Sequence, residues 1–405
     1  MEYFKKNFIG RNLMDWVEDS ELKEIFGVSS EGAVRLRNYI TAFDKNRYNN
    51  KPIDEDFLYE FKQYASSLIQ TIEYTGFDMG YRDAKIINET GANSKVYMGM
   101  KIDGKKVVVK EAVLLWNNDQ MKMDQKVGLI FEAIITKIMH KISKEIPNFH
   151  SPDIYSCSRT MDYKSVLILE EVPGKSLYTH KDEMKSIETL ANIIQLLQQT
   201  VNFSHRDLHG YNVMWDGTSI SIIDYGMACI SMPYNRDMSV QDISGWYKYK
   251  LKYDNYPNNL SKALRSCNNK SHDMCMIILA LARKTTDETL KRWAKQITIG
   301  YIKKMRSGYN KYTVARLVYL NRYDRKDMRS FFFPDIPLYT KFLDKPSSMT
   351  AEQIYDDLQD GKRQKNLPWA FIYQLYEIEL EEFTPENILK KINDNFLAGF
   401  GDLKF

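Results

Sequence analysis

Alternating apolar and polar residues predict strands in the first half of the chain. Residues 95–110, KVYMGMKIDGKKVVVK, alternate on both sides of an Asp-Gly pair. Such a pair favours a tight turn because glycine adopts positive φ without steric cost. The run SVLILEEVPGKSL at 165–177 is apolar until Glu-Glu-Val-Pro-Gly stops it. The pattern therefore predicts a β-hairpin and, further along the chain, a buried strand.

A helical spacing of apolar residues is clearest at 128–142, GLIFEAIITKIMHKI. Isoleucine recurs there at every fourth position, which predicts one apolar face, formed by Ile130, Ile134, Ile138 and Ile142. Glu132 is the only carboxylate in this segment, and a surface position in the first helical turn, favoured by the helix dipole, is one explanation for it. The run SHDMCMIILALA at 271–282 predicts a second buried helix, with Asp273 near its start.

Residues 1–45 predict a small helical module. Its apolar positions fall on two helices, with Gly27 at the position of a C-terminal cap between them. The apolar residues are Leu22, Ile25 and Phe26 in the first helix and Val34, Leu36 and Ile40 in the second. The pattern resembles the later part of a sterile-alpha-motif domain, which implies a possible protein partner. The alternative is a generic helical hairpin, and because so short a unit has little core of its own, we expect it to dock on the rest of the chain.

Composition and charge narrow the class of protein. The 405 residues are 43% hydrophobic and 27% charged, as in ordinary globular proteins, and the net charge is +4. No apolar run reaches the ~20 residues that a membrane span needs, and MEYFKKNFIG lacks the apolar core of a signal peptide. None of the four cysteines forms a C-x-x-C pair. We therefore expect an intracellular, cytoplasmic protein with reduced thiols and no membrane partner.

One segment interleaves basic and aromatic residues. Residues 301–329, YIKKMRSGYNKYTVARLVYLNRYDRKDMR, could present stacking tyrosines to a nucleic acid. Solvated faces of ordinary helices produce the same pattern, and the nearly balanced net charge favours that explanation. We expect no nucleic-acid partner.

The densest candidate chemistry lies at 205–226, HRDLHGYNVMWDGTSISIIDYG. Two short apolar runs flank Asp-Gly and predict a hairpin. The fold-back would bring Asp207 and Asn212 close to Asp224. Carboxylate and amide oxygens suit Mg²⁺, which binds to one or two carboxylates together with phosphate oxygens. One carboxylate would remain to accept a hydroxyl proton, and this combination predicts phosphoryl transfer.

These residues resemble the protein-kinase superfamily. His205-Arg206-Asp207 and Asn212 match the catalytic loop H-R-D-x-x-x-x-N, and Asp224-Tyr225-Gly226 matches D-F-G with Tyr in place of Phe. The resemblance is to divergent members, such as haspin-like kinases and the kinases of large DNA viruses. It implies an α+β, bilobal fold that binds ATP and Mg²⁺, with Mn²⁺ as a possible substitute. Asp207 would be the catalytic base, and Asn212 and Asp224 the metal ligands.

The resemblance also assigns roles upstream. Lys110, after three valines, looks like the V-A-I-K lysine that holds the α- and β-phosphates, and Glu132 like its ion-pair partner. In the register of the glycine-rich loop only one glycine remains, so that loop is divergent; its residues are Gly91, Ala92, Asn93 and Ser94. The strand at 165–177 would join the two lobes, with Leu169 behind the adenine and backbone groups from Glu170 to Val172 binding it.

Two further positions complete the comparison. Asp273 is the candidate to brace the catalytic-loop backbone, with a role at the helix N-terminus as the alternative. His209 stands where Ser/Thr kinases carry lysine, a variant that also occurs in small-molecule phosphotransferases of the superfamily. No A-P-E follows Gly226.

The resemblance implies the following organisation. The expected parts are the helical module at 1–45, a linker and helix at 46–80, a small lobe at 81–172, a large lobe at 173–345 and a helical C-terminal extension at 346–405. The expected activity is an ATP- and Mg²⁺-dependent kinase acting on a protein substrate, with Ser/Thr preferred to Tyr. The alternatives are a small-molecule phosphotransferase and a pseudokinase scaffold.

Overall fold

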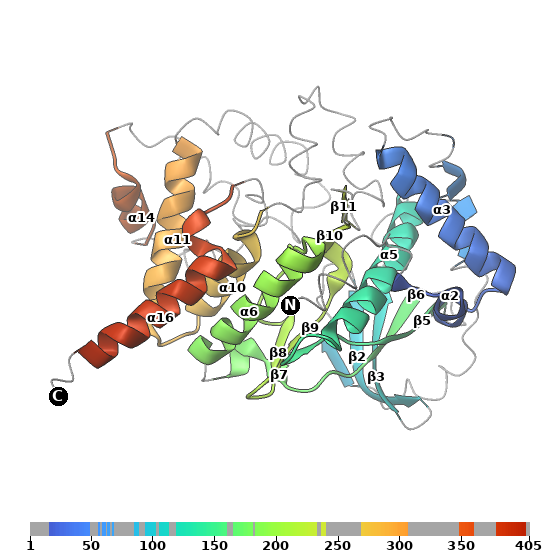
Figure 1. Ribbon diagram of the computed structural model, residues 1–405, viewed down its shortest axis with the longest axis horizontal. Helices are drawn as coiled ribbons and strands as arrows, with labels where there is room; N and C mark the ends of the chain where they lie inside the picture. The colour runs from blue at the N-terminus through green and yellow to red at the C-terminus, as the bar shows by residue number, and fades with distance from the viewer. Residues whose placement is uncertain are drawn as a thin grey trace. The chain divides into compact units, whose positions relative to one another are not determined.

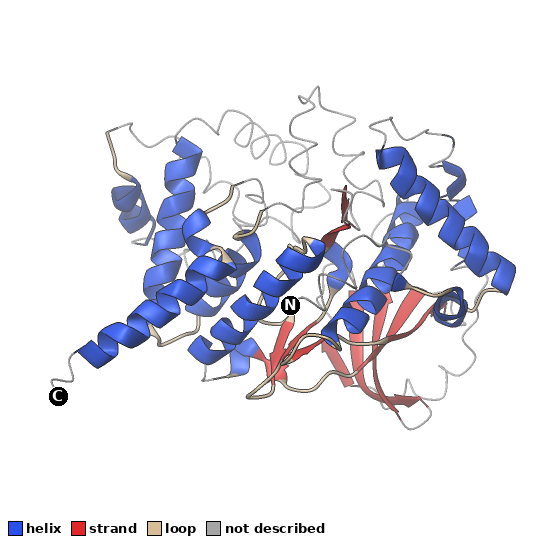
Figure 2. Ribbon diagram, in the orientation of Figure 1, coloured by secondary structure: helices blue, strands red, loops and turns tan. Residues whose placement is uncertain are grey.

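The structure is a computed structural model, drawn in Figure 1. It describes residues 16–48, 56, 59–61, 63–64, 67–68, 85–88, 94–102, 105–112, 119–159, 165–180, 183–232, 236–239, 269–306, 348–359 and 378–401. Helices and strands are both present, so the fold class is α+β (Figure 2). The chain divides into two compact units. The first comprises Met1–Gly174, Leu197–His205 and Thr218–Cys267, and the second Lys175–Leu196, Arg206–Gly217 and Asn268–Phe405.

An antiparallel sheet is the main feature of the first unit. In spatial order its strands are β1 (Lys85–Asn88), β2 (Ser94–Ile102), β3 (Lys105–Ala112), β6 (Ser165–Glu170) and β5 (Ile154–Arg159). The predicted hairpin is confirmed as β2 and β3, and the predicted buried strand as β6. Val107 and Val109 lie in the core together with Val166 and Ile168, whereas Val108 between them is only half-buried. The strand β3 continues to Ala112, so Lys110 lies inside the strand rather than at its end.

The predicted helix at 128–142 is confirmed as part of α5 (Asp119–Ser143), which begins nine residues earlier. All four isoleucines of its apolar face are fully buried. Glu132 is also buried, more than three turns from the first residue of the helix. The explanation of Glu132 as a surface residue in the first turn is therefore wrong, and a buried carboxylate requires a partner.

The N-terminal module forms α2 (Asp19–Phe26) and α3 (Ser30–Tyr48). Gly27 ends α2 with φ of 60°, in the left-handed conformation that glycine adopts without strain. Val34, named above among the apolar residues of the second helix, is 44% exposed. Ala33 is buried instead, because residues 33, 36 and 40 share one face of a helix and residue 34 lies about 100° away.

The module docks on the rest of the first unit, as expected for so short a segment. The helix α2 contacts β5. Its Glu21 carboxylate lies 2.5 Å from the Lys141 ammonium and 3.8 Å from that of Lys137, both on α5. Lys137 also binds Asp153, 2.8 Å away. The N-terminal module therefore contacts α5, the helix that carries Glu132, through these ion pairs.

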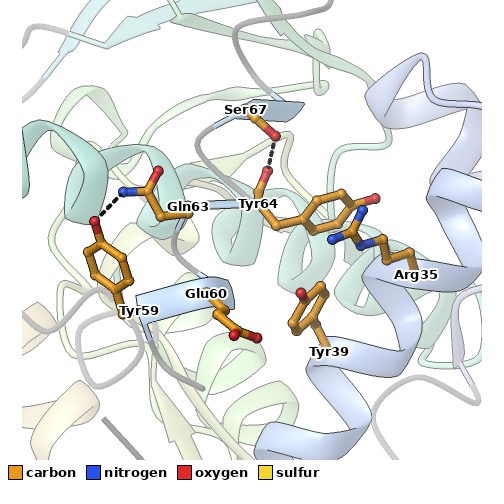
Figure 3. A pocket seen from close by; sticks show the side chains of 7 residues that line it. All are labelled: Arg35, Tyr39, Tyr59, Glu60, Gln63, Tyr64 and Ser67. Carbon is orange, nitrogen blue, oxygen red and sulfur yellow. Dashed lines mark hydrogen bonds between the residues drawn. The ribbon is translucent and has the colours of Figure 1, made fainter. Parts of the chain in front are cut away.

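The described residues of the segment 56–68 are helical. Figure 3 shows the hollow of about 530 Å³ that they line together with α3. One wall of the hollow is a stack of three side chains. The guanidinium carbon of Arg35 lies 4.4 Å from the centre of the Tyr64 ring, and the centres of the Tyr39 and Tyr64 rings are 5.2 Å apart. The Tyr64 hydroxyl donates a hydrogen bond to the Gly32 carbonyl. These contacts tie the segment to α3.

Charge reversal at Glu21 should destabilise this docking. In Glu21→Lys a third cation would face Lys141 and Lys137, and we expect the free energy of unfolding to fall by about 1–2 kcal/mol, since the groups are only partly buried. Thermal unfolding of the full chain measures the change. Glu24→Lys, the same replacement at an exposed position of α2, is the control and should have little effect. Equal stability of the two variants would show that the module does not depend on this contact.

Shorter strands complete the first unit. They are β4 (Phe149–His150), paired in parallel with β9 (Ile220–Ile222), and the antiparallel pair β10 (Cys229–Met232) and β11 (Arg236–Ser239). Cys157 and Cys275 are free and buried, but Cys229 is disulfide-bonded. The expectation of four reduced thiols is therefore wrong at Cys229. Cysteine spacing could not reveal this, because tertiary folding decides which thiols meet.

The second unit is mainly helical, apart from the short strands β7 (Lys175–Ser176) and β8 (Val213–Trp215) and the turn η3 (Leu177–Thr179). Its helices are the part of α6 (Glu183–Val201) up to Leu196, α10 (His272–Ala282), α11 (Glu288–Arg306), α14 (Ala351–Gln359), the short η6 (Glu381–Phe383) and α16 (Pro385–Gly401). The predicted buried helix is confirmed as α10. The helix α16 begins with a cap that suits it: Asn387 N–H donates to the Thr384 hydroxyl, and Pro385 is the first helical residue.

The described residues limit two further expectations. Of the basic segment 301–329, only the residues up to Arg306 are described, and there Tyr301 is fully buried in α11 rather than exposed for stacking. Of the linker and helix at 46–80, only part is described. Among the described residues, no helix has the length and apolar character to cross a bilayer.

Candidate functional site

Three charged residues meet in the first unit. Lys110 Nζ lies 2.7 Å from Glu132 Oε1 and 2.7 Å from Asp224 Oδ1. Each comes from a different element: Lys110 from β3, Glu132 from α5, and Asp224 from the residue before the turn η4 (Tyr225–Met227). Lys110 is fixed in the sheet between Val96 of β2 and Leu167 of β6. The sequence singled out all three residues, and the structure brings them together.

Burial and charge act against each other in this cluster. Burial alone would lower the pKa of Lys110, but the charges of Asp224 and Glu132 outweigh it and hold the pKa above its usual value. Burial raises the pKa of Glu132, assisted by the charge of Asp224 and opposed by Lys110. Burial also opposes ionisation of Asp224, but Lys110, His205 and the Gly226 N–H lower its pKa overall. Asp224 is the stronger acid, in keeping with its side chain being 38% exposed.

The cluster carries an excess negative charge. Among the described residues, two carboxylates share the one ammonium of Lys110 in a largely buried place, so the carboxylates outnumber the ammonium groups. No group of three or more His, Cys, Asp or Glu side chains in the described ranges is arranged to hold a metal ion. Mg²⁺ does not need such a cage, because it commonly binds to one or two carboxylates together with phosphate oxygens. The charge of the cluster therefore fits a divalent cation that arrives with a phosphate.

Gly226 allows the two carboxylates to approach the turn. A Cβ at this position would lie 3.1 Å from Glu132 Oε2 and 3.3 Å from Asp224 Oδ1, closer than most side chains tolerate. Asp224 itself has φ of 64°, in the left-handed region, where Asp is tolerated better than most residues. The Gly226 N–H donates to Asp224 Oδ1 over 3.4 Å. The Asp-Tyr-Gly sequence thus matches the local backbone geometry.

The strand end that carries Asp224 is braced by buried polar groups. His205 Nε2 lies 2.9 Å from the Ile223 carbonyl. The hydroxyl that distinguishes Tyr225 from Phe contacts Ser151 Oγ at 2.8 Å and the Ile222 carbonyl at 3.0 Å. Burial raises the pKa of Tyr225, so the hydroxyl stays neutral and able to donate. Ser151 carried no signal in the sequence, because its role depends only on this contact.

The predicted catalytic loop lies in the second unit. Asn212 Nδ2 donates to the Asp207 carbonyl at 2.9 Å, and Asn212 N–H donates to the His209 carbonyl at 2.8 Å. Asp273 is fully buried and accepts a hydrogen bond from Arg206 N–H at 2.8 Å. Arg206 has φ of 65°, so this bond fixes an unusual backbone conformation. The bracing contact of Asp273 is confirmed; Asp273 is not the N-cap of α10, which is Ser271, but it does lie in the first turn, where the helix dipole favours a carboxylate.

His209 contacts the predicted base. Its Nε2 lies 3.5 Å from Asp207 Oδ1. Tyr211 N–H donates to His209 Nδ1 over 3.2 Å, which in the neutral ring leaves the proton on Nε2, facing the carboxylate. Ser176 also stabilises the predicted catalytic loop, because its hydroxyl donates a hydrogen bond of 2.6 Å to the Gly210 carbonyl. The sequence analysis missed Ser176.

The predicted nucleotide residues are described only in part. Gly91, Ala92 and Asn93 lie outside the described residues, and Ser94 is the first residue of β2. Leu169 and Glu170 end β6, and Val172 follows two residues later; all three are half-buried.

Some of the backbone groups predicted to bind adenine already form hydrogen bonds within the protein. Glu170 N–H donates to the Asp153 carbonyl, and Glu171 N–H to that of Lys106. The Glu170 side chain accepts from Asp153 N–H and lies 3.4 Å from His150 Nε2, and the hydrogen bond with His150 is the main cause that lowers its pKa. Because the N–H groups of Glu170 and Glu171 already donate within the protein, the backbone groups expected to bind adenine are limited to those near Val172.

Asp207 and Asn212 belong to one unit and Asp224 to the other. Their convergence on one metal ion remains a prediction. Neither a protein-family model nor a curated protein matches this chain, so its function is inferred from the residues of these clusters alone.

Proposed function

We propose that this protein is a protein kinase of bilobal, kinase-like fold that transfers the γ-phosphate of ATP to a protein hydroxyl, Ser or Thr in preference to Tyr. The observation that supports this most strongly is the buried contact of Lys110 with Glu132 and Asp224. It joins a strand lysine to a helix glutamate and to an aspartate 114 residues away. Phosphoryl transfer requires hydrogen-bond donors for the phosphate oxygens and carboxylates for their metal ion. A lysine ammonium placed between two carboxylates offers both.

The proposed roles follow from the chemistry of each side chain. Lys110, oriented by Glu132, binds the α- and β-phosphates. Asp224 and Asn212 are the residues that would supply oxygen ligands to Mg²⁺, which would offset the phosphate charge, and Mn²⁺ would serve the same purpose. Asp207 orients the acceptor hydroxyl and accepts its proton. Asp273 acts through Arg206 by holding the backbone next to Asp207.

Two observations keep alternatives open. His209 beside Asp207 is compatible with a small-molecule phosphotransferase, since that variant occurs in such enzymes. The divergent loop at 91–94 is compatible with a pseudokinase that serves as a scaffold. The polar residues proposed for catalysis are all present, which favours an active enzyme.

Nucleotide binding provides the first test. We expect ATP to raise the melting temperature of the full chain only when Mg²⁺ or Mn²⁺ is present, because the excess negative charge near Lys110 repels free phosphate. Each tenfold excess of Mg-ATP over its Kd should add about 1.4 kcal/mol to the free energy of unfolding. ATP with EDTA is the control. No shift at millimolar Mg-ATP would favour the scaffold alternative.

An assay with labelled ATP then distinguishes a protein kinase from a small-molecule phosphotransferase. Transfer of ³²P to a generic protein substrate or to a Ser-containing peptide supports the protein kinase. Transfer only to small hydroxyl compounds would instead identify a small-molecule phosphotransferase.

A further inference from the structure

A cation and two aromatic rings lie next to the predicted base in the second unit. Lys284 Nζ is 4.6 Å from the centre of the Tyr178 ring and 5.7 Å from that of Tyr211. The two rings meet edge to face, with centroids 4.6 Å apart. Tyr211 is 57% exposed, unusual for a large aromatic side chain. We call these three residues the aromatic-lysine cluster.

The aromatic-lysine cluster is attached rigidly to the catalytic loop. Tyr178 packs so closely on Gly210 that a Cβ there would come within 2.9 Å of the ring. Tyr211 lies against the His209 ring, with centroids 6.1 Å apart, and His209 in turn contacts Asp207. The charge of Asp207 is also close enough to contribute to the raised pKa of Tyr178, whose main cause is burial. A peptide whose hydroxyl reaches Asp207 therefore passes the cluster within a few residues.

Apart from the two aromatic rings, the Lys284 ammonium has no charged partner in the described part of the chain. Lys284 is exposed, and no described carboxylate pairs with it. Nearby Lys291, by contrast, binds Glu288 at 2.8 Å. Lys284 follows the C-terminal end of α10, where the helix dipole favours a cation. The dipole explains a positive charge at this place, but it does not account for an exposed aromatic platform beneath it.

We infer that the aromatic-lysine cluster recognises an anionic group on the acceptor substrate, a carboxylate or a phosphate, within a few residues of the hydroxyl that is phosphorylated. The inference deepens the proposed function and rests on it. An ammonium on an aromatic platform binds such a group by charge, and the rings provide apolar contact for the adjacent peptide. The protein would therefore prefer acidic or already phosphorylated sites.

The experiment compares four peptides that share one acceptor serine. Their flanking residues are neutral, acidic (Asp/Glu), phosphoserine-containing or basic. Binding is measured by fluorescence anisotropy with the full chain and with the acceptor replaced by alanine, so that the result does not require catalysis. Phosphorylation of the serine peptides is measured in parallel. We expect the acidic or the phosphorylated peptide to bind at least about fivefold more tightly than the neutral one, and the preference to weaken with salt. The comparison of these two peptides identifies the source of the anionic group.

Variants assign the preference to Lys284. Lys284→Met keeps the apolar stem and should remove the preference, Lys284→Glu should reverse it toward the basic peptide, and Lys284→Arg should retain it. Lys291→Met is the matched control and should bind like the unaltered protein. Equal binding of all four peptides, or a preference that survives Lys284→Met, overturns the inference. If peptides are phosphorylated without regard to charge, the proposed function stands and only the inference fails. If anionic peptides bind through Lys284 but nothing is phosphorylated, the proposed catalytic activity fails instead.

Discussion

Replacement of Lys110 by methionine should lower the free energy of unfolding by about 3 kcal/mol and abolish stabilisation by Mg-ATP. The ammonium is the shared partner of Glu132 and Asp224. Without it, two carboxylates remain close together in a mostly buried place, and loss of one partner from a buried ion pair typically costs about 3–5 kcal/mol. We take the lower value because Asp224 retains contact with water. Urea unfolding of the full chain measures the change.

The loss should depend on pH. The pKa of Glu132 is already raised by burial and by Asp224, and removal of the ammonium raises it further. A carboxyl group whose folded pKa lies above its unfolded pKa favours folding at pH values below the unfolded pKa. That contribution is lost as the pH rises through the folded pKa. The Lys110→Met variant should therefore be less destabilised near pH 5 than near pH 8.

Two controls separate this effect from simple loss of a lysine. Lys106→Met alters an exposed lysine of the same strand, 3.8 Å from Glu171, and should change stability little. The double variant Lys110→Met with Glu132→Gln should recover part of the lost stability, because one of the unpaired charges is removed. A Lys110→Met protein with the stability of the unaltered chain at pH 8 would show that the three groups do not form a coupled buried cluster.

Replacement of Asp207 by asparagine should reduce phosphotransfer by a factor of about 10² to 10⁴, the usual contribution of a general base. Asparagine has nearly the same shape but cannot accept the hydroxyl proton. The loop should remain folded, since Asn212 binds the backbone carbonyl of residue 207 rather than its side chain. The residues proposed to bind nucleotide are unchanged, so the melting-temperature shift with Mg-ATP should persist. Initial rates with labelled ATP measure the loss.

The control for Asp207→Asn is the same replacement at Asp216, which is exposed in the turn between β8 and β9. Asp216→Asn should keep full activity. Asp207→Asn with an unchanged rate would exclude Asp207 as the base. A loss of both the rate and the Mg-ATP shift would instead point to a damaged fold.

Local patterns in the sequence determined several of the helices and strands. Alternation around an Asp-Gly pair specified β2 and β3, and fourfold isoleucine spacing specified α5, because side-chain direction repeats with period 2 in a strand and 3.6 in a helix. Gly27 marked a helix end because few residues adopt the left-handed conformation of a C-terminal cap without strain. Motif spacing also singled out Lys110, Glu132 and Asp224. Their chemistry could be named, but not their mutual distance.

Only the tertiary structure decided which of these groups meet. That Lys110 binds Asp224 as well as Glu132 depends on the packing of α5 against η4 and on the position of β3 in the sheet, which no local period encodes. The same holds for the hydrogen bond from the Arg206 N–H to Asp273, 67 residues apart, which only the folded chain could show. Ala33 rather than Val34 is buried because neighbouring segments pack on the face of α3 that carries Ala33. Contacts between distant segments follow from how whole faces pack, and a residue's neighbours along the chain do not contain that information.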